Sequence, residues 1–403
     1  MDLAKGLDTL LYAAVVAALA PMVVALLPGP RIPQVVVLMA GGVLMGPEVL
    51  GWADRPEIDL LANVGLGFLF LLAGYELDLH LFRERPGRLA MASWLVTAVL
   101  ATTLIGVLAG AGFVHAFVPV ALGLTTTTTL GTLLPILRDN DMLEGRFGRY
   151  LLAAGAVGEL FPIVAIALFL GANNKFVALG SLASVGLLAV VLSFAPRLVQ
   201  GNRLGRILLE GEGSTAQTTV RWTVLLLLLL LAIAEEFGLD AVLGAFLAGI
   251  VLRCWAPGHV HDLEGKLDAI GYGFFIPLFF VASGMTLDIR SIAEAPGRLL
   301  VFFVLLLVIR GVPALFLYRK DLPAAQRTQM MLLTATALPL LVALAEIGLR
   351  NGTMLRENAA ALVGAGALSV LVFPMVAVAI ERRRRAAVRP AVAPSAEAPP
   401  GTE

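Results

Sequence analysis

Two ionisable side chains lie deep within long apolar stretches of the sequence. Glu159 is surrounded by alanine, glycine, valine and leucine, and Arg310 by leucine, valine and isoleucine. Apolar surroundings disfavour the charged form of a carboxylate, so a proton or a cation has to neutralise Glu159. The carboxylate can hold one or the other but not both, which is the competition needed to exchange a cation for a proton.

Arg310 remains protonated at any relevant pH and can either pair with Glu159 or hold an anion. Intramembrane charges are candidates for function. The structural alternative is a permanent Glu159–Arg310 ion pair that only fixes the packing of two helices. We find no Walker loop, no metalloprotease motif and no nucleophile motif in a suitable context. The sequence therefore predicts a protein that is not an enzyme and uses no cofactor.

The composition is that of an integral membrane protein. Hydrophobic residues make up 59% of the 403 residues, charged residues 14%, and the mean hydropathy is +0.90. Soluble domains carry about 45–50% apolar and about 25% charged residues. The expected partner is the lipid bilayer, and a net charge of zero gives no indication of a nucleic-acid partner.

A bilayer core requires about 20 mostly apolar helical residues per crossing. The sequence predicts an all-α polytopic domain over residues 1–380, followed by a basic and then Pro/Ala-rich disordered tail over 381–403. We read the first stretch as a retained helix, because no cleavage site for a signal peptide follows it. The thirteen predicted helices are 8–27, 32–47, 59–77, 89–111, 114–137, 149–171, 176–196, 220–236, 239–253, 269–285, 298–318, 328–349 and 358–380.

The basic residues predict the orientation of these helices. Arginines 382–385 follow the last helix, so we place the C-terminus in the cytoplasm, and an odd number of helices then places the N-terminus outside. This arrangement puts 21 of the 29 Lys and Arg residues on the cytoplasmic side. We therefore expect a multi-pass protein of the cell membrane.

The two halves of the sequence resemble each other. Gly74–Leu79 and Gly284–Ile289 share a Gly-x-x-Leu-Asp pattern, and the clearest pairs of segments are about 208–210 residues apart. Each partner lies seven helices later, so the second copy is upside down in the membrane. Inverted repeats of this kind are typical of secondary transporters. The predicted repeats cover about 8–171 and 220–380, with a linker helix over about 176–196.

Two helices at matching positions of the repeats carry signals for a break. The fifth contains five consecutive threonines, 125–129, whose hydroxyls can satisfy backbone groups of an unwound helix. The twelfth contains Pro339, which lacks an amide hydrogen. We predict breaks near Thr126 and Pro339, as expected for a transport site. The alternative is that the threonines bond back to their own helix and Pro339 only kinks it.

Several segments are similar to those of a known family, above all Leu243–Gly249 and Phe279–Met285. Further segments are Arg31–Pro47, Gly74–Leu79 and Thr125–Leu137. Together they resemble the membrane domain of the cation:proton antiporter superfamily. The resemblance is to its second branch, with the sodium/hydrogen exchanger and potassium-efflux proteins.

The resemblance implies a homodimer in which a mobile core domain moves against a dimerisation domain. The core would contain the crossing of the two broken helices, an ion-binding carboxylate on the sixth helix and a basic residue on the eleventh. Glu159 and Arg310 fall at these two positions. The family usually has Asp at the carboxylate position, preceded by Asn, Asp or Gln, whereas this sequence has Gly158-Glu159.

We therefore expect a secondary active transporter that exchanges Na⁺ or K⁺ for protons by alternating access. Glu159 would be the shared site, Arg310 would compensate its charge, and Thr127, Thr128 and Thr336 would add oxygen ligands. A single titrating carboxylate favours electroneutral exchange. Two alternatives remain open: a proton-coupled carrier of organic anions or other solutes on the same fold, and a membrane sensor that transports nothing.

Overall fold

The computed structural model describes most of the chain as helices. Described are residues 3–26, 33–77, 79–112, 117–126, 133, 137, 140–143, 145–170, 175–194, 217–255 and 260–388, and these residues form no strand. The fold is therefore all-α, as predicted.

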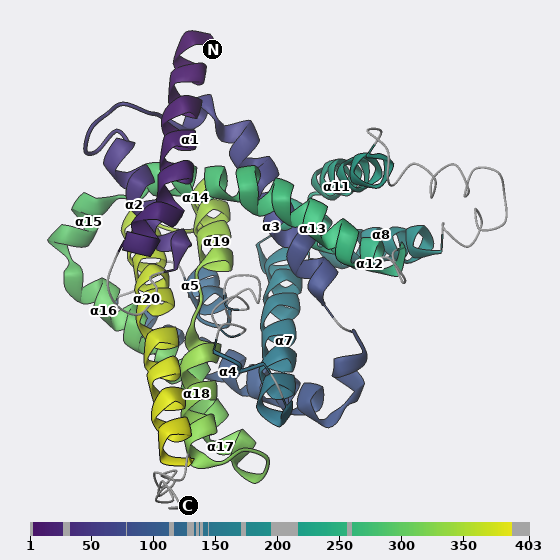
Figure 1. The fold of residues 1–403 in the computed structure, drawn as a ribbon, viewed down its shortest axis with the longest axis vertical. Coiled ribbons are helices and arrows are strands. Elements are labelled where there is room, and N and C mark those ends of the chain that lie inside the picture. Colours follow the sequence, from purple (N-terminus) through teal and green to yellow (C-terminus); the bar gives the residue numbers. More distant parts are fainter. Residues whose placement is uncertain are drawn as a thin grey trace, which may run out of the picture.

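The helices differ widely in length, and several follow one another without a loop (Figure 1). The α-helices are α1 (Leu3–Leu26), α2 (Gln34–Met45), α3 (Asp59–Glu76), α4 (Arg85–Gly110), α5 (Phe117–Gly123), α7 (Gly145–Phe169), α8 (Lys175–Ser193), α11 (Thr218–Glu236), α12 (Ala241–Trp255), α13 (Val260–Ile270), α14 (Ile276–Met285), α15 (Ile289–Glu294), α16 (Pro296–Leu305), α17 (Val312–Leu317), α18 (Ala324–Ala335), α19 (Pro339–Arg350) and α20 (Arg356–Val388). The 3₁₀ turns are η1 (Arg55–Glu57), η2 (Leu79–Arg83) and η5 (Tyr318–Lys320), and the π-helices are η3 (Gly271–Phe275) and η4 (Leu306–Gly311).

Within the described residues, nine helical stretches are long and apolar enough to cross a membrane, and three shorter apolar helices accompany them. These twelve correspond to twelve of the thirteen predicted segments. The remaining segment, 114–137, is represented by α5, and most of its residues after Thr126 lie outside the described residues. The prediction of a multi-pass membrane protein is confirmed.

The last helix is longer than the sequence predicted. α20 continues past residue 380 through the basic residues to Val388. Glu381 explains this extension, because it accepts hydrogen bonds from Arg384 and Arg385 within the helix and from Gln329 of α18. Residues 389–403 lie outside the described residues.

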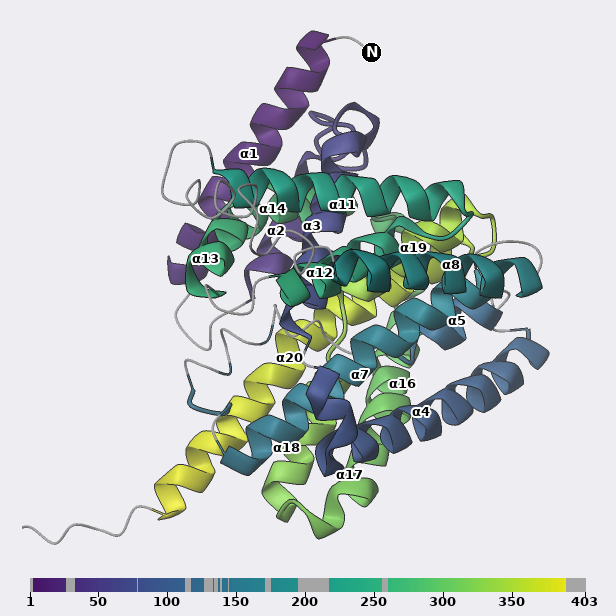
Figure 2. The same cartoon turned by 90° about the vertical axis from the view of Figure 1, so that its right-hand side faces the viewer.

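The helices pack in two groups. The first helix group contains α1, α2, α3, α11, α12, α13 and α14, and the second contains α4, α5, α7 and α16 to α20. α8 contacts α12 of the first group and α7 of the second. Figure 2 shows α11 and α14 in the upper part of the molecule and α4, α16 and α17 in the lower part. The dimerisation domain and the mobile core domain that the family resemblance implies stay a prediction.

Four glycines allow very close helix contacts in the first helix group. Gly74 of α3 and Gly249 of α12 each face the backbone of the other helix, and Gly42 of α2 and Gly284 of α14 do the same. A Cβ atom at any of the four would lie 2.0 to 2.2 Å from a carbonyl oxygen. Gly284 follows Gly74 by 210 residues and Gly249 follows Gly42 by 207. The inverted repeat, whose clearest pairs are predicted to lie 208–210 residues apart, stays a prediction.

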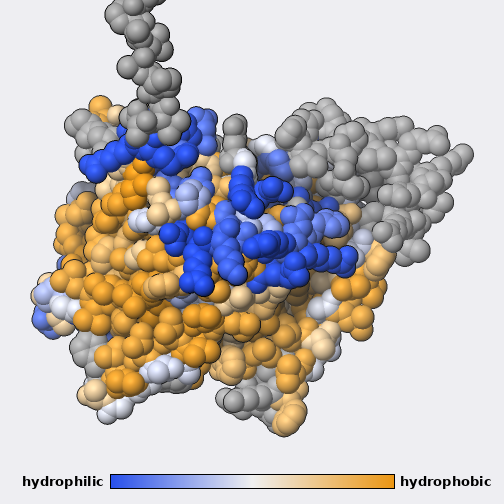
Figure 3. Space-filling model, turned by 90° about the horizontal axis from the view of Figure 1, so that it is seen from below, coloured by the Kyte–Doolittle hydropathy of each residue, from blue (hydrophilic) through white to orange (hydrophobic). Residues whose placement is uncertain are grey.

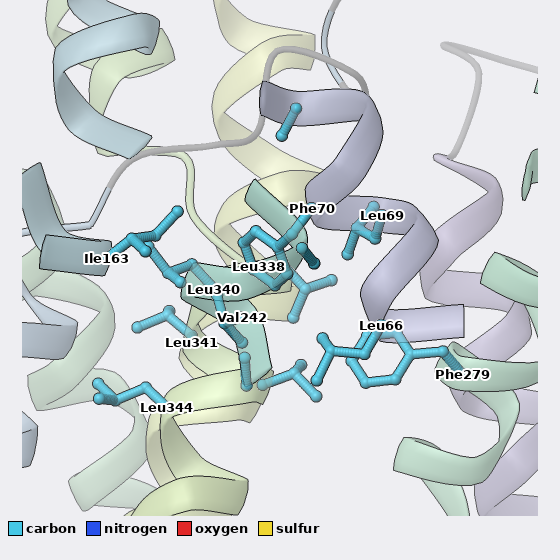
Figure 4. Packing of buried hydrophobic residues seen from close by; sticks show 14 of the residues in the cluster. Leu66, Leu69, Phe70, Ile163, Val242, Phe279, Leu338, Leu340, Leu341 and Leu344 are labelled. Atoms are coloured by element: carbon cyan, nitrogen blue, oxygen red, sulfur yellow. The ribbon is translucent and has the colours of Figure 1, made fainter. Parts of the chain in front are cut away.

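A hydrophobic cluster lies where the two groups meet. Figure 4 shows Leu66 and Phe70 of α3 and Phe279 of α14 together with Leu341 and Leu344 of α19. All are buried. Side chains of α3, α14 and α19 thus belong to one apolar cluster in this region.

The segments that we predicted on the cytoplasmic side are hydrogen-bonded to one another. Arg385 at the end of α20 bonds Asp141, which precedes α7, with 3.0 Å between Nη1 and Oδ2. Arg85 at the start of α4 forms an ion pair with Asp321, which follows α17. Seen from below, where α20 ends in Figure 1, a hydrophilic patch is bordered by hydrophobic surface (Figure 3). The side of the membrane on which these segments lie stays a prediction.

Candidate functional site

Glu159 lies in the middle of α7 and is 2% exposed. Small residues surround it in the sequence, including Gly155 and Gly158, which are buried as well. Its carboxylate is within electrostatic range of the Tyr272 hydroxyl on π-helix η3, as are those of Glu76 and Asp268. α7 also contacts α12, so the helix that carries Glu159 lies at the boundary of the two helix groups.

Arg310 belongs to the second helix group and lies beside α7. Its side chain is 2% exposed, and its Nη2 atom donates a hydrogen bond to the carbonyl oxygen of Ala154, 3.4 Å away. Its Nε atom has no hydrogen-bond partner among the described atoms. No ion pair joins Arg310 to Glu159, both of which are described, so the permanent pair considered as an alternative is not formed.

The position of Arg310 depends on an irregular helix. η4 is a π-helix between α16 and α17, and such insertions occur frequently at functional sites. Gly311 follows Arg310 and brings this helix close to α18, because a Cβ atom there would lie 2.7 Å from the carbonyl oxygen of Met331. The arginine is therefore held in the interior of the second helix group.

The break predicted at Pro339 is visible in the backbone. α18 ends at Ala335 with Thr336 extended (φ −72°, ψ 123°), and α19 begins at Pro339. Proline is well suited to the first helical position, where its missing amide hydrogen has no partner in any case. In the gap, the amide of Ala337 donates to Oγ of Ser369 on α20, 3.1 Å away. Ser369 thus satisfies the broken backbone, a role that nothing in the sequence indicated.

The described threonines of the two predicted breaks bond back to their own helices. Thr125 and Thr126 donate to the carbonyl oxygens of Leu122 and Gly123, each at 2.7 Å, and α5 ends at Gly123. Thr336 donates to the carbonyl oxygen of Leu332, at 3.0 Å. For these hydroxyls the structure thus shows the alternative considered above, in which the threonines bond back to their own helix. Each hydroxyl oxygen still has lone pairs that are available to a cation.

Thr127 and Thr128 lie outside the described residues, so the structure gives no geometry for these two predicted ligands. The end of α5 is nevertheless near α19. A Cβ atom on Gly123 would lie 3.0 Å from a side-chain atom of Leu344 and 3.2 Å from one of Leu341. The last described turn of the fifth predicted helix therefore packs on the half-helix that comes after the break at Pro339.

A cluster of polar side chains holds the N-terminal end of α7. Oδ1 of Asp321 accepts a hydrogen bond from the hydroxyl of Tyr150 at 2.8 Å and forms an ion pair with Arg85 at 3.0 Å. The rings of Tyr150 and Tyr318 meet edge to face, with 5.7 Å between their centroids. These contacts join α7 and α4 to η5 and the residue that follows it, so the helix that carries Glu159 is held at its N-terminal end. No motif indicated this cluster, because its members are widely separated along the chain.

Comparison with known families gives a match over most of the chain. The family model described as "Sodium/hydrogen exchanger, transmembrane" matches residues 14–380. The protein YjbQ of Bacillus subtilis is 28% identical over 79% of this chain and 54% of its own length. The Na⁺/H⁺-K⁺ antiporter GerN of Bacillus cereus is 25% identical over 70% of each chain. The chain thus spans about half the length of YjbQ.

The fold is also that of a solved structure. The sodium proton antiporter MjNhaP1 of Methanocaldococcus jannaschii has a TM-score of 0.61 to this chain, with 16% identity. The match covers 96% of this chain and 98% of MjNhaP1. At this identity the likeness concerns the fold.

Proposed function

The chain belongs to the sodium/hydrogen exchanger family, and we propose that it exchanges a monovalent cation for protons by alternating access, with Glu159 as the shared site. The single observation that carries this proposal is the burial of Glu159. A carboxylate that is 2% exposed in the middle of a membrane helix needs a neutralising proton or cation. Its place beside the boundary of the two helix groups would let relative movement of the groups expose it to either side.

The transported cation is Na⁺ or K⁺ in this proposal. The name of GerN includes both ions, and that of MjNhaP1 includes sodium. Oxygen ligands beside Glu159 would come from Thr336, Thr127 and Thr128. Arg310 would compensate the charge of Glu159 when the carboxylate holds no ion. One exchanging carboxylate predicts electroneutral transport, so a transport rate that changes with membrane voltage at fixed ion gradients would contradict this part.

The orientation and assembly belong to the same proposal. The C-terminus would be cytoplasmic, because the basic residues of α20 and of the neighbouring loops lie together. The protein would be a homodimer in which the first helix group forms the contact between subunits. Several apolar side chains of α1 and α11, such as Leu11 and Trp222, are exposed in the single chain and are available for this contact or for lipid.

The test uses purified protein in liposomes that contain a pH-sensitive dye. Na⁺, K⁺ or Li⁺ is added outside, and wild type is compared with Glu159→Gln. We expect a cation-dependent pH change inside the wild-type liposomes and none with the variant. No response of the wild type to any cation would refute antiport. A response that is unchanged in Glu159→Gln would mean that another carboxylate is the shared site.

The second candidate is a proton-coupled carrier of organic anions. The buried guanidinium of Arg310 favours it, because this cation has no carboxylate partner among the described residues and its Nε atom has no partner among the described atoms. Proton flux in the same liposomes that depends on an added carboxylate or phosphate compound, and not on the cation, would support this candidate.

A further inference from the structure

A cavity of about 620 Å³ lies where α2, α14 and α19 end and α20 begins. Both helix groups line it. The lining includes Glu48, Arg55 and Ser283 from the first helix group and Val342, Glu346 and Arg350 from the second. All segments around it were predicted on the same side of the membrane, opposite to the C-terminus.

An ion-pair network crosses this cavity and joins the two helix groups. Oε1 of Glu346 on α19 accepts hydrogen bonds from Arg55 of η1 and from Arg350 of α19, the latter at 2.7 Å. Arg55 also bonds Asp59 of α3 at 3.0 Å, and Arg350 donates to Asn63 of α3 at 3.1 Å. The two arginines therefore connect Glu346 to the start of α3.

The central ion pair is largely shielded from solvent. The side chains of Arg55 and Glu346 are each 11% exposed. Exposed ion pairs contribute little to stability, whereas breaking a buried pair leaves a charge without a partner and has a large effect. The Arg55–Glu346 pair resembles a buried pair, so it resists separation of α19 from η1.

On α19 the network is followed, toward the start of the helix, by members of the hydrophobic cluster. Glu346 is one turn beyond Val342 on α19, and Leu341 and Leu344 of the same helix belong to the cluster. Ile163, one turn after Glu159 on α7, belongs to the same cluster and lies beside Leu340 in Figure 4. Side chains on both sides of this part of α19 therefore belong to one apolar cluster.

We propose that Glu346 is a positioning residue for transport: through Arg55 it holds α19 against the first helix group and closes the path from the cavity to Glu159. This inference rests on the proposed function, since it assigns the residues that close one side of the exchanger. Opening of that side requires α19 to leave η1 and α3. The bonds of Glu346 to Arg55 and of Arg350 to Asn63 then break together, and the apolar contacts of Leu341 and Leu344 separate.

The test measures the access of a small reagent to the bottom of the cavity. Cys254, the single cysteine of the chain, is replaced by serine, and Val342→Cys places a thiol on α19 below Glu346. The labelling rate with N-ethylmaleimide is measured on the purified full chain. We expect Glu346→Gln and Arg55→Gln each to raise this rate about tenfold, which corresponds to about 1.4 kcal/mol in favour of the open form. Arg55→Lys, which keeps the charge, should stay within about threefold of the parent.

Two controls separate closure from a general loosening of the fold. Glu357→Gln breaks an ion pair with Arg298 that lies within the second helix group, and it should leave the labelling rate unchanged. A thiol introduced by Leu333→Cys is buried and does not line the cavity, so Glu346→Gln should not accelerate its labelling.

Equal acceleration at positions 342 and 333 would overturn the proposal, as would unchanged labelling in both Glu346→Gln and Arg55→Gln. The labelling needs no ion gradient, so its result is independent of the liposome test. If the liposomes show no antiport but the labelling rate still changes in the variants, the closing role of Glu346 and Arg55 would stand. Only the proposed ion exchange would then be refuted.

Discussion

Arg310 donates a hydrogen bond to the carbonyl oxygen of Ala154, five residues before Glu159 on the same helix. The two opposite charges of the site are thus carried by neighbouring helices, but the guanidinium bonds the backbone of α7 and not the carboxylate. In the proposed exchange, Arg310 would therefore not compete directly with the ion for Glu159. The arrangement also includes a buried cation whose presence cannot be explained by a gain in stability.

Replacement of Arg310 should separate stability from transport. Arg310→Met removes a buried charge that has no carboxylate partner among the described residues, so we expect unfolding in detergent to require on the order of 1 kcal/mol more free energy or to be unchanged. Exchange in liposomes should fall at least about tenfold, the effect of losing about 1.4 kcal/mol of charge compensation. Arg310→Lys, which keeps the charge, should retain part of the activity. Full exchange by Arg310→Met would show that the arginine has no part in transport.

The charge of Glu159 is expected to matter more than its shape. Glu159→Gln keeps the side-chain volume and cannot exchange a proton, so the protein should fold normally and show no cation-dependent proton flux. Glu159→Asp keeps the carboxylate but shortens the side chain by one methylene, so it should exchange ions with a higher apparent KM for the cation. Glu236→Gln, at an exposed position at the end of α11, serves as the matched control and should behave as wild type. Loss of activity in both Gln variants would point to a general effect on folding.

Single features of the sequence were enough to predict most of the helices and one helix break. Apolar stretches of about 20 residues give the membrane helices, because the bilayer leaves few alternatives for the backbone. Pro339 marks the start of α19, since proline cannot continue a helix from α18 but can begin one. The deep positions of Glu159 and Arg310 follow in the same way from the apolar residues on both sides of each.

The partners of these residues could not be predicted, because they come from distant parts of the chain. Ser369 is 32 residues from Ala337, whose amide it satisfies, and its neighbours in sequence contain no motif. Asp321 is 171 residues from Tyr150 and looked like an ordinary loop residue. The π-helix at Arg310 depends on how α16 and α17 pack, and a periodicity of 3.6 residues does not indicate it.

The close contacts of Gly42 and Gly249 predict an unusual sensitivity to a methyl group. In either Gly→Ala variant the new Cβ would lie 2.0 Å from a carbonyl oxygen, so the two helices have to separate. We expect a loss of about 1–3 kcal/mol of stability in each, as for overpacked interiors, measured by thermal unfolding in detergent. Gly186→Ala in α8, where no atom lies within 4 Å of the new Cβ, should have no such effect. Equal losses at all three positions would mean that helix packing is not the cause.

Asp288 predicts a pH-dependent contribution to stability at the start of α15. Its Oδ1 accepts from the amide of Ser291 at 2.8 Å and its Oδ2 from the hydroxyl at 2.7 Å, as expected for an N-terminal cap. These bonds hold the pKa of Asp288 below its ordinary value. The folded protein therefore binds this proton less tightly than the unfolded chain does. The stabilisation is complete above the ordinary Asp pKa of about 3.9 and is lost as the pH falls through the lower pKa of the folded state.

Asp288→Asn tests this, because asparagine can cap a helix but does not ionise in this pH range. At pH 7 we expect wild type to have the higher Tm, by a small amount, since Asp288 is close to solvent and such charges are screened. The difference should shrink as the pH is lowered below about 4 and disappear when Asp288 is protonated in the folded state. Asp288→Ala removes the cap and should be less stable than Asn at every pH, by about 0.5–2 kcal/mol. A Tm difference between wild type and Asn that stays constant down to the lowest pH would show that the charge of Asp288 does not contribute.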